Sequence, residues 1–352
     1  MTPPGALAQE AMALGDDAAN LDDSQRAKFL TAQLDGLAAT AERLAGKTVP
    51  YKEEVRRCYG IRIERTDEAE FAEAHEALDR VIPGAGPLRD RYHAWLHATE
   101  IPMNAVLDVV PALKGALHRR TVELFGLPDG ELAEVELTSN QPWQGFNYYL
   151  GGLRSRVVIN TDIPTRADFL VMLLAHEIYP GHHTEHSWKE DLLVRGRAQL
   201  EESIFLIATP QCLVAEGIAS YALEALGPEA ESTCAALLAD AGHAYDLELS
   251  RAVRDIQHAL AATLKNAALM LHEEGADRDA AMRYLRRWSV ETDERLEQSL
   301  DFLIHPVWRA YNPIYEAGYR AVAAWTNGEP ARFRRLLTEQ LTASDLTAPT
   351  EM

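Results

Sequence analysis

The sequence contains few cysteines and no long uninterrupted apolar run. Its three cysteines, Cys58, Cys212 and Cys234, are odd in number and widely separated along 352 residues. That spacing argues against a disulfide framework or a zinc ribbon and is typical of free, buried thiols in a reducing compartment. No window approaches the length of a membrane span, and no basic segment followed by an apolar run opens the chain. We therefore expect no secretory signal, no membrane partner and a cytoplasmic location.

The chain also lacks a surplus of basic residues. Its formal net charge is −20 at pH 7. Nucleic acids and anionic membranes attract basic surfaces, so this charge argues against both as partners. The apolar fraction of 47% and the charged fraction of 25% are ordinary for a folded globular protein. A chain of this length can bury a large core in one domain or two, and its oligomeric state is left open.

The first part of the chain has a helical pattern. Apolar residues recur at three- and four-residue intervals in residues 30–46 and again in residues 71–82. Asp22-Asp23-Ser24 offers side chains that cap the start of a helix. These patterns predict an N-terminal helical region, residues 1–131, continuous as one domain with a second region, residues 132–345.

The pattern changes where the second region begins. Residues 131–139 and 145–160 hold the main concentration of alternating and β-branched residues, and Gly151-Gly152 divides the second stretch as in a hairpin. After Asn160-Thr161-Asp162 the pattern is helical again. We therefore predict a mainly α fold with a small β hairpin or sheet beside one helix of the second region.

The most informative segment is HEIYPGHH, residues 176–183, which follows an apolar run. In an HExxH zinc site, two histidines four residues apart share one helical face, and the glutamate after the first activates water. Here Pro180 occupies the second position. On an unbroken helix His182 and His183 would lie about 9 and about 10.5 Å further along the axis. A kink or two-residue bulge at Pro180-Gly181 would instead bring His182 to the place of the second ligand.

The alternative is a helix that ends at Pro180 and leaves a cluster of surface histidines. The apolar run leads directly into His176 and Glu177, however, which places two polar groups at the end of a buried helix. Buried ionisable groups need partners or a metal. This context favours metal binding over a surface cluster.

A second segment offers a third metal ligand. Residues 213–221 form an apolar helical stretch with a single acid, Glu216. A glutamate on a following helix completes a zinc site of two histidines, one carboxylate and a water. The neighbouring Gly217 would allow another helix to approach closely. The alternative is a carboxylate that pairs with Arg or Lys on the surface.

Together, HEIYPGHH (176–183) and EGIASY (216–221) resemble an uncharacterised bacterial family, a domain of unknown function with the signature HExxPGHH. The resemblance extends over residues 50–325 and includes the hairpin sequence upstream, although many relatives are longer at the N-terminus. The family is regarded as metallopeptidase-like and related to gluzincins such as thimet oligopeptidase and carboxypeptidase Taq. The resemblance implies one Zn²⁺ per chain, held by His176, His182 and Glu216, with Glu177 as general base.

The resemblance also implies roles near the C-terminus. The segment YNPIYEAGY, residues 311–319, is similar to a tyrosine-rich segment of that clan, in which tyrosine hydroxyls donate hydrogen bonds to the oxyanion. It implies Tyr315 in this role, with Tyr311 as the second candidate. Helix packing is the alternative explanation for tyrosines four residues apart. Asp255 lies in a stretch similar to an Arg/Asp/His helix of the family and is a candidate to orient a ligand histidine, or it faces solvent.

The motifs and the resemblance predict a zinc-dependent metallohydrolase, in the first place a peptidase, with residues 132–345 as its zincin-like catalytic region. Zinc-bound water would attack a carbonyl, and Glu177 would accept its proton and pass it to the departing amine. The edge of the predicted hairpin would hold an extended peptide by main-chain hydrogen bonds.

Two alternatives stay open. One is a hydrolase of small non-peptide amides on the same metal. The other is a non-catalytic zinc-binding or scaffold protein, in which His183 or His186 fills the fourth position. Glu177 argues against the closed site, because a structural zinc needs no base.

Overall fold

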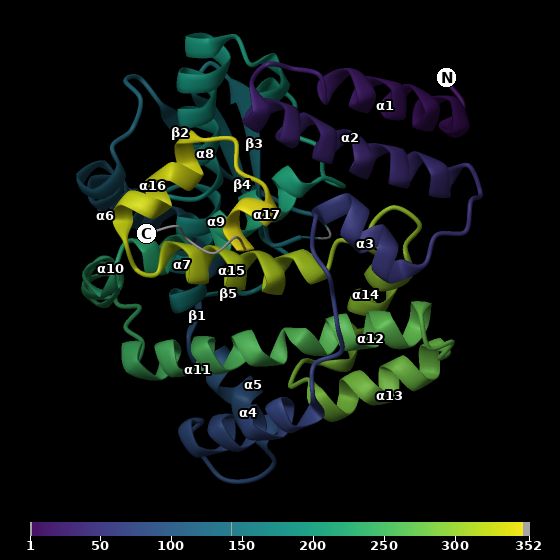
Figure 1. Cartoon of the computed structure of the whole chain (residues 1–352). Helices are drawn as coiled ribbons and strands as arrows, with labels where there is room; N and C mark the ends of the chain where they lie inside the picture. Colours follow the sequence, from purple (N-terminus) through teal and green to yellow (C-terminus); the bar gives the residue numbers. More distant parts are fainter. Residues whose placement is uncertain (1, 142, 348–352) are drawn as a thin grey trace.

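The computed structural model describes residues 2–141 and 143–347, and helices dominate it (Figure 1). The predicted mainly α fold with small sheets is confirmed. The helices of the N-terminal part are α1 (Pro4–Ala18), α2 (Ser24–Leu44), α3 (Tyr51–Tyr59), α4 (Glu68–Val81), α5 (Leu88–Ala98) and α6 (Met103–Phe125). As expected, α2 begins after Asp23, whose side chain accepts a hydrogen bond from the Arg26 amide.

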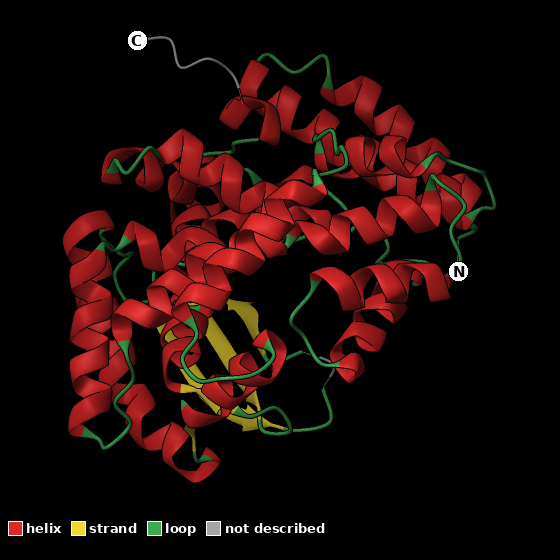
Figure 2. Ribbon diagram, turned by 90° about the horizontal axis from the view of Figure 1, so that it is seen from below, coloured by secondary structure: helices red, strands yellow, loops and turns green. Residues whose placement is uncertain are grey.

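The strands form two small sheets, and Figure 2 shows them gathered at one place among the helices. Strands β2 (Leu132–Thr138), β4 (Arg154–Asn160) and β3 (Gly145–Gly151) lie in that order. The predicted hairpin is confirmed: β3 and β4 are antiparallel, and Gly151 and Gly152 turn the chain with φ of 73° and 66°. Strand β2 runs parallel to β4. The second sheet pairs β1 (Glu100–Ile101) with β5 (Thr165–Arg166).

Helices resume directly after the sheet. α7 (Ala167–Glu177) and α8 (His182–Lys189) follow each other closely, and short π and 3₁₀ turns at Glu190–Arg195 and Leu200–Ser203 lead to α9 (Pro210–Ala225). The remaining helices are α10 (Pro228–Asp240), α11 (Leu247–Leu260), α12 (Ala262–His272), α13 (Arg278–Trp288), α14 (Asp293–Ile304), α15 (Pro313–Thr326), α16 (Pro330–Thr338) and α17 (Ala343–Thr347). Within the described residues, none of the helices has the length and apolar character needed to span a bilayer.

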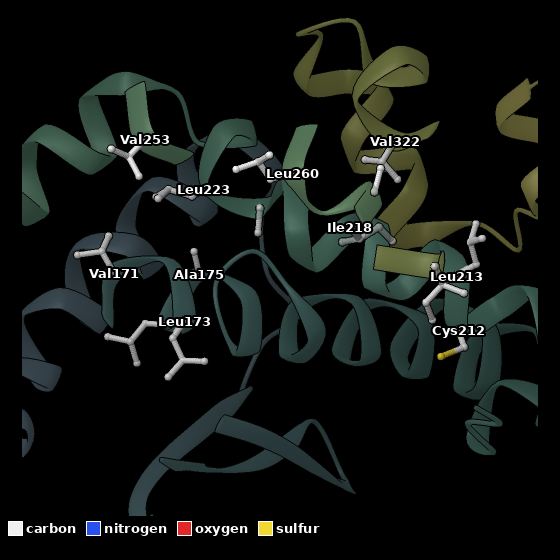
Figure 3. Packing of buried hydrophobic residues seen from close by; sticks show 14 of the residues in the cluster. Val171, Leu173, Ala175, Cys212, Leu213, Ile218, Leu223, Val253, Leu260 and Val322 are labelled. Atoms are coloured by element: carbon white, nitrogen blue, oxygen red, sulfur yellow. The ribbon is translucent and has the colours of Figure 1, made fainter. Parts of the chain in front are cut away.

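One large apolar cluster extends through the described parts of the chain. It includes buried residues from before residue 132, such as Phe71 and Leu117, and many from after it. Figure 3 shows a part of it, with Val171 of α7, Ile218 of α9 and Val322 of α15 among the labelled residues. The division into regions 1–131 and 132–345 stays a prediction. The three cysteines are free and buried.

Helices α9 and α15 pack against each other (Figure 1). Two glycines, Gly217 of α9 and Gly318 of α15, face each other at this contact. A Cβ on Gly217 would lie 2.5 Å from the carbonyl oxygen of Gly318. A Cβ on Gly318 would in turn lie 2.7 Å from the carbonyl oxygen of Leu213. Only glycine leaves room for backbones at this separation. The expectation that Gly217 permits a close helix approach is confirmed. The crossing brings Glu216 of α9 next to Tyr311, which lies just before α15, and Tyr315 in its first turn.

Candidate metal centre

The HEIYPGHH segment is divided between two helices. α7 ends at Glu177, the chain turns through Ile178–Gly181 with a cis Tyr179–Pro180 peptide, and α8 begins at His182. The interruption lies where the sequence predicts it and covers four residues instead of a two-residue bulge. The reason is that Ile178 already leaves helical geometry, with φ −124° and ψ −79°, before the proline. The break returns His182 to the side of His176, where an unbroken helix would separate them.

Gly181 makes this return possible. Its amide donates to the carbonyl oxygen of Ala175 at 2.9 Å, so the chain folds back against the last turn of α7. A Cβ at position 181 would lie 1.8 Å from the carbonyl oxygen of His176. No L side chain fits in that space, because a Cβ position is fixed by the backbone.

His176, His182 and Glu216 converge from α7, α8 and α9. Their potential ligand atoms all lie within 4.8 Å of one another. Nε2 of His176 is 3.6 Å from Oε2 of Glu216, and Nε2 of His182 is 3.8 Å from Oε1. The exposed fraction of the side chain is 21% for His176, 12% for His182 and 9% for Glu216. The structure therefore brings together all three residues expected to bind metal.

The chemistry of this group fits a divalent cation such as zinc. Burial lowers the pKa of His176 to about 4 and that of His182 well below its ordinary value. Both imidazole rings are therefore neutral near pH 7, the form that binds a metal ion. Burial also raises the pKa of Glu216 to about 7. Its buried Oε2 has no hydrogen-bond partner among the described residues. Two imidazoles and a carboxylate are a known zinc ligand set, and a cation would satisfy the unpartnered oxygen.

His183 points away from this group. Its Nδ1 lies 2.8 Å from the Ser155 hydroxyl and its Nε2 lies 2.6 Å from Oε2 of Glu131. Because both ring nitrogens have partners, His183 is not free to bind a metal at His182. His186, one turn further along α8, stacks beside His182 at 6.3 Å between ring centroids and lies outside the three-residue group. In the described structure, neither His183 nor His186 therefore supplies the fourth ligand that a non-catalytic zinc site would need.

Glu177 is buried beside the triad and held by strand β3. The side-chain amide of Asn147 donates to the Glu177 carbonyl oxygen at 2.6 Å. Burial and then the charge of Glu216 raise the pKa of the Glu177 carboxyl to about 8, and a hydrogen bond from the Asn147 backbone opposes them. Asn147 was not identified from the sequence. The available signal was a polar residue at an inward position of an alternating strand, between the exposed Phe146 and Tyr148.

The two tyrosines of the 311–319 segment have different surroundings. The hydroxyl of Tyr311 donates to Oε1 of Glu216 at 2.7 Å. Tyr315 lies one turn further, with its ring 5.5 Å from that of Tyr311, and the residue is 42% exposed. Loss of hydration and the charge of Glu216 raise the pKa of both hydroxyls above the ordinary value, so both remain protonated donors. Tyr311 is engaged with a candidate ligand, and Tyr315 is the more exposed of the two tyrosines.

Asp255 faces solvent, which is the second of the two alternatives considered for it. It is exposed on α11, while the preceding Arg254 pairs with Glu224 and Glu231. These ion pairs join α9, α10 and α11, which indicates a structural role for this part of α11.

Comparisons with known proteins support the fold and leave the activity open. No family model matches the chain, and no curated protein matches it. Among solved structures the chain is similar to a putative lipoprotein from Colwellia psychrerythraea, with a TM-score of 0.59 and 14% identity. The match covers 97% of this chain and 66% of that one, so this chain spans just under two-thirds of the length of its structural neighbour. At this identity the likeness concerns the fold alone.

Proposed function

We propose that this protein is a zinc-dependent metallohydrolase of the gluzincin type and that it cleaves peptides. The observation that carries the proposal is the convergence of His176, His182 and Glu216 around an unpartnered buried carboxylate oxygen. These three residues would hold one Zn²⁺ per chain. When bound, zinc supplies Lewis-acid chemistry: it polarises a carbonyl and lowers the pKa of a water molecule.

The residues around the triad fit hydrolysis. The Glu177 carboxyl is buried, and the side-chain amide of Asn147 holds the backbone carbonyl of the same residue. In its ionised form the carboxylate accepts a proton from the attacking water and returns it to the departing amine nitrogen. The Tyr315 hydroxyl donates a hydrogen bond to the substrate oxygen as negative charge develops there. Tyr311 holds the carboxylate of Glu216 in a fixed orientation.

Strand β3 favours a peptide over a small amide. In the described part of the chain β3 pairs only with β4, so its other edge keeps main-chain donors and acceptors. The same strand carries Asn147, which contacts Glu177. An extended peptide added at this edge would lie beside the base, and main-chain hydrogen bonds would align it.

The proposal is tested by assaying zinc-loaded protein against a peptide library and a panel of small amides. We expect peptide cleavage that stops on chelation and returns when zinc is restored. Cleavage of small amides alone would favour the non-peptide hydrolase. Bound zinc with no hydrolysis in either set would favour the non-catalytic zinc protein.

A cytoplasmic location is part of the proposal, supported by three free, buried cysteines. The solved neighbour carries the name of a lipoprotein, which makes a lipid-anchored location the alternative. Recovery of the native protein with the membrane fraction of its own cells would overturn the cytoplasmic assignment.

A further inference from the structure

Glu131 contacts both sides of the break that places His182. It directly precedes β2 and belongs to neither of the two metal-binding segments. Its Oε2 accepts a hydrogen bond from the Tyr179 hydroxyl at 2.7 Å and one from Nε2 of His183 at 2.6 Å. Its Oε1 lies 3.0 Å from Nε2 of His118. One carboxylate, with a side chain only 7% exposed, thus joins the residues that flank Pro180, Gly181 and His182.

The contacts of His183 fix the orientation of α8. Nε2 faces the Glu131 carboxylate and donates to it, and Nδ1 is hydrogen-bonded to the Ser155 hydroxyl of β4. Consecutive residues of a helix point about 100° apart. Holding the His183 ring against the sheet therefore directs the His182 ring toward the other side of α8, where His176 and Glu216 lie.

Other contacts tie the break to α7 and α8, the helices on either side of it. The Thr184 hydroxyl donates to the Ile178 carbonyl oxygen at 2.9 Å, and the Gly181 amide donates to that of Ala175. These contacts hold the backbone of the turn in place. Glu131 adds a contact on the sheet side, through side chains that lie immediately before Pro180 and immediately after His182.

The charge of Glu131 suits this role. Burial acts to raise its pKa, but the hydrogen bonds from His183 and Tyr179 outweigh burial and keep the pKa below its ordinary value. Glu131 is therefore ionised at neutral pH, and hydrogen bonds to an ionised acceptor are stronger than those between neutral groups.

We propose that Glu131 is a positioning residue for the metal centre: it holds Tyr179 and His183 so that the His182 imidazole faces the metal. This inference rests on the proposed zinc site. It predicts that loss of Glu131 weakens zinc binding although no ligand is removed. Partners that orient ligands cost about 10–100-fold in metal affinity when they are lost.

The test compares Glu131→Ala, Glu131→Gln and a control, Glu231→Ala, by zinc competition titration, thermal unfolding and the absorption spectrum of Co²⁺-loaded protein. Glu231 is a fitting control, because its side chain is 6% exposed and it pairs with Arg251 and Arg254 away from the triad. We expect Glu131→Ala to lose about 10–100-fold in zinc affinity and to change the Co²⁺ spectrum. Glu131→Gln keeps an acceptor oxygen, so we expect its zinc affinity and Co²⁺ spectrum to lie between those of Glu131→Ala and the wild type. Glu231→Ala loses stability and keeps wild-type affinity.

Two outcomes overturn the inference, and they are distinguishable. If Glu131→Ala is less stable but keeps the wild-type zinc affinity and Co²⁺ spectrum, Glu131 has a purely structural role and the proposed zinc site is unaffected. A wild type that binds no zinc would remove the site itself. If Glu131→Ala does not fold, Tyr179→Phe removes one hydrogen bond to Glu131 and keeps the ring; we expect it to lose zinc affinity several-fold, and unchanged affinity would overturn the inference equally.

Discussion

Replacing Glu177 by glutamine is expected to abolish hydrolysis and to leave zinc binding intact. The amide keeps the size of the side chain and is not expected to affect the hydrogen bond from Asn147 to the backbone carbonyl. It cannot accept a proton from water, and general base catalysis contributes about 10²–10⁴-fold to such reactions. The expected result is a fall in kcat of about 10³-fold, measured together with zinc content on the same preparation.

Glu231→Gln provides the matched control for this variant. Glu231 is also a buried acid, but it joins α10 to α11 through its arginine partners and lies outside the triad. We expect this variant to keep wild-type kcat. Undiminished hydrolysis by zinc-loaded Glu177→Gln would remove Glu177 from the mechanism, whatever the control shows.

Gly181→Ala is expected to cost folding stability and zinc binding together. The added Cβ would lie 1.8 Å from the carbonyl oxygen of His176 and 2.6 Å from that of Ala175. Overpacking costs about 1–3 kcal/mol where side chains can move aside. Here the obstacle is backbone, so we expect a loss of at least about 3 kcal/mol in the free energy of unfolding, measured by urea denaturation with zinc content recorded alongside.

Gly15→Ala is the corresponding control in α1. Its Cβ would meet only the Cβ of Leu34, at 3.9 Å, and alanine favours a helix interior over glycine by about 0.5–1 kcal/mol. We expect this variant to be as stable as the wild type or more stable. A Gly181→Ala protein with unchanged stability and zinc content would mean that the turn between α7 and α8 does not follow the described path.

The fold was predictable where local patterns determine it. Period-two alternation on either side of Gly151-Gly152 predicted the β3–β4 hairpin, and Gly217 beside an acid predicted a close helix approach. The proline at position 180 predicted a broken helix, because a continuous one would separate the histidines.

Spacing alone left open which histidine follows His176 as a ligand. The deciding contacts of His183 are with Ser155 and Glu131, which are 28 and 52 residues away in the sequence. Periodicity and motifs describe neighbours along the chain and do not reveal such partners. Glu131 was therefore missed, although its carboxylate is hydrogen-bonded to His118, Tyr179 and His183.

The same limit applies to the tyrosines. Their spacing places Tyr311 and Tyr315 one turn apart, and it does not indicate which hydroxyl meets Glu216. That contact joins residues 95 positions apart and depends on the crossing of α9 and α15 at Gly217 and Gly318. The resemblance implied Tyr315 as first candidate for the oxyanion, and this role stays a prediction.

Zinc content per chain, measured by elemental analysis, tests the central claim most directly. The proteins to compare are the wild type and the His182→Ala, His183→Ala and Glu216→Ala variants, after zinc is supplied and unbound metal is removed. The account predicts one zinc per chain in the wild type and its loss in the His182 and Glu216 variants. His183→Ala keeps most of its zinc, because it loses a positioning contact and no ligand. A wild type without zinc, or zinc kept in His182→Ala and lost in His183→Ala, would contradict the account.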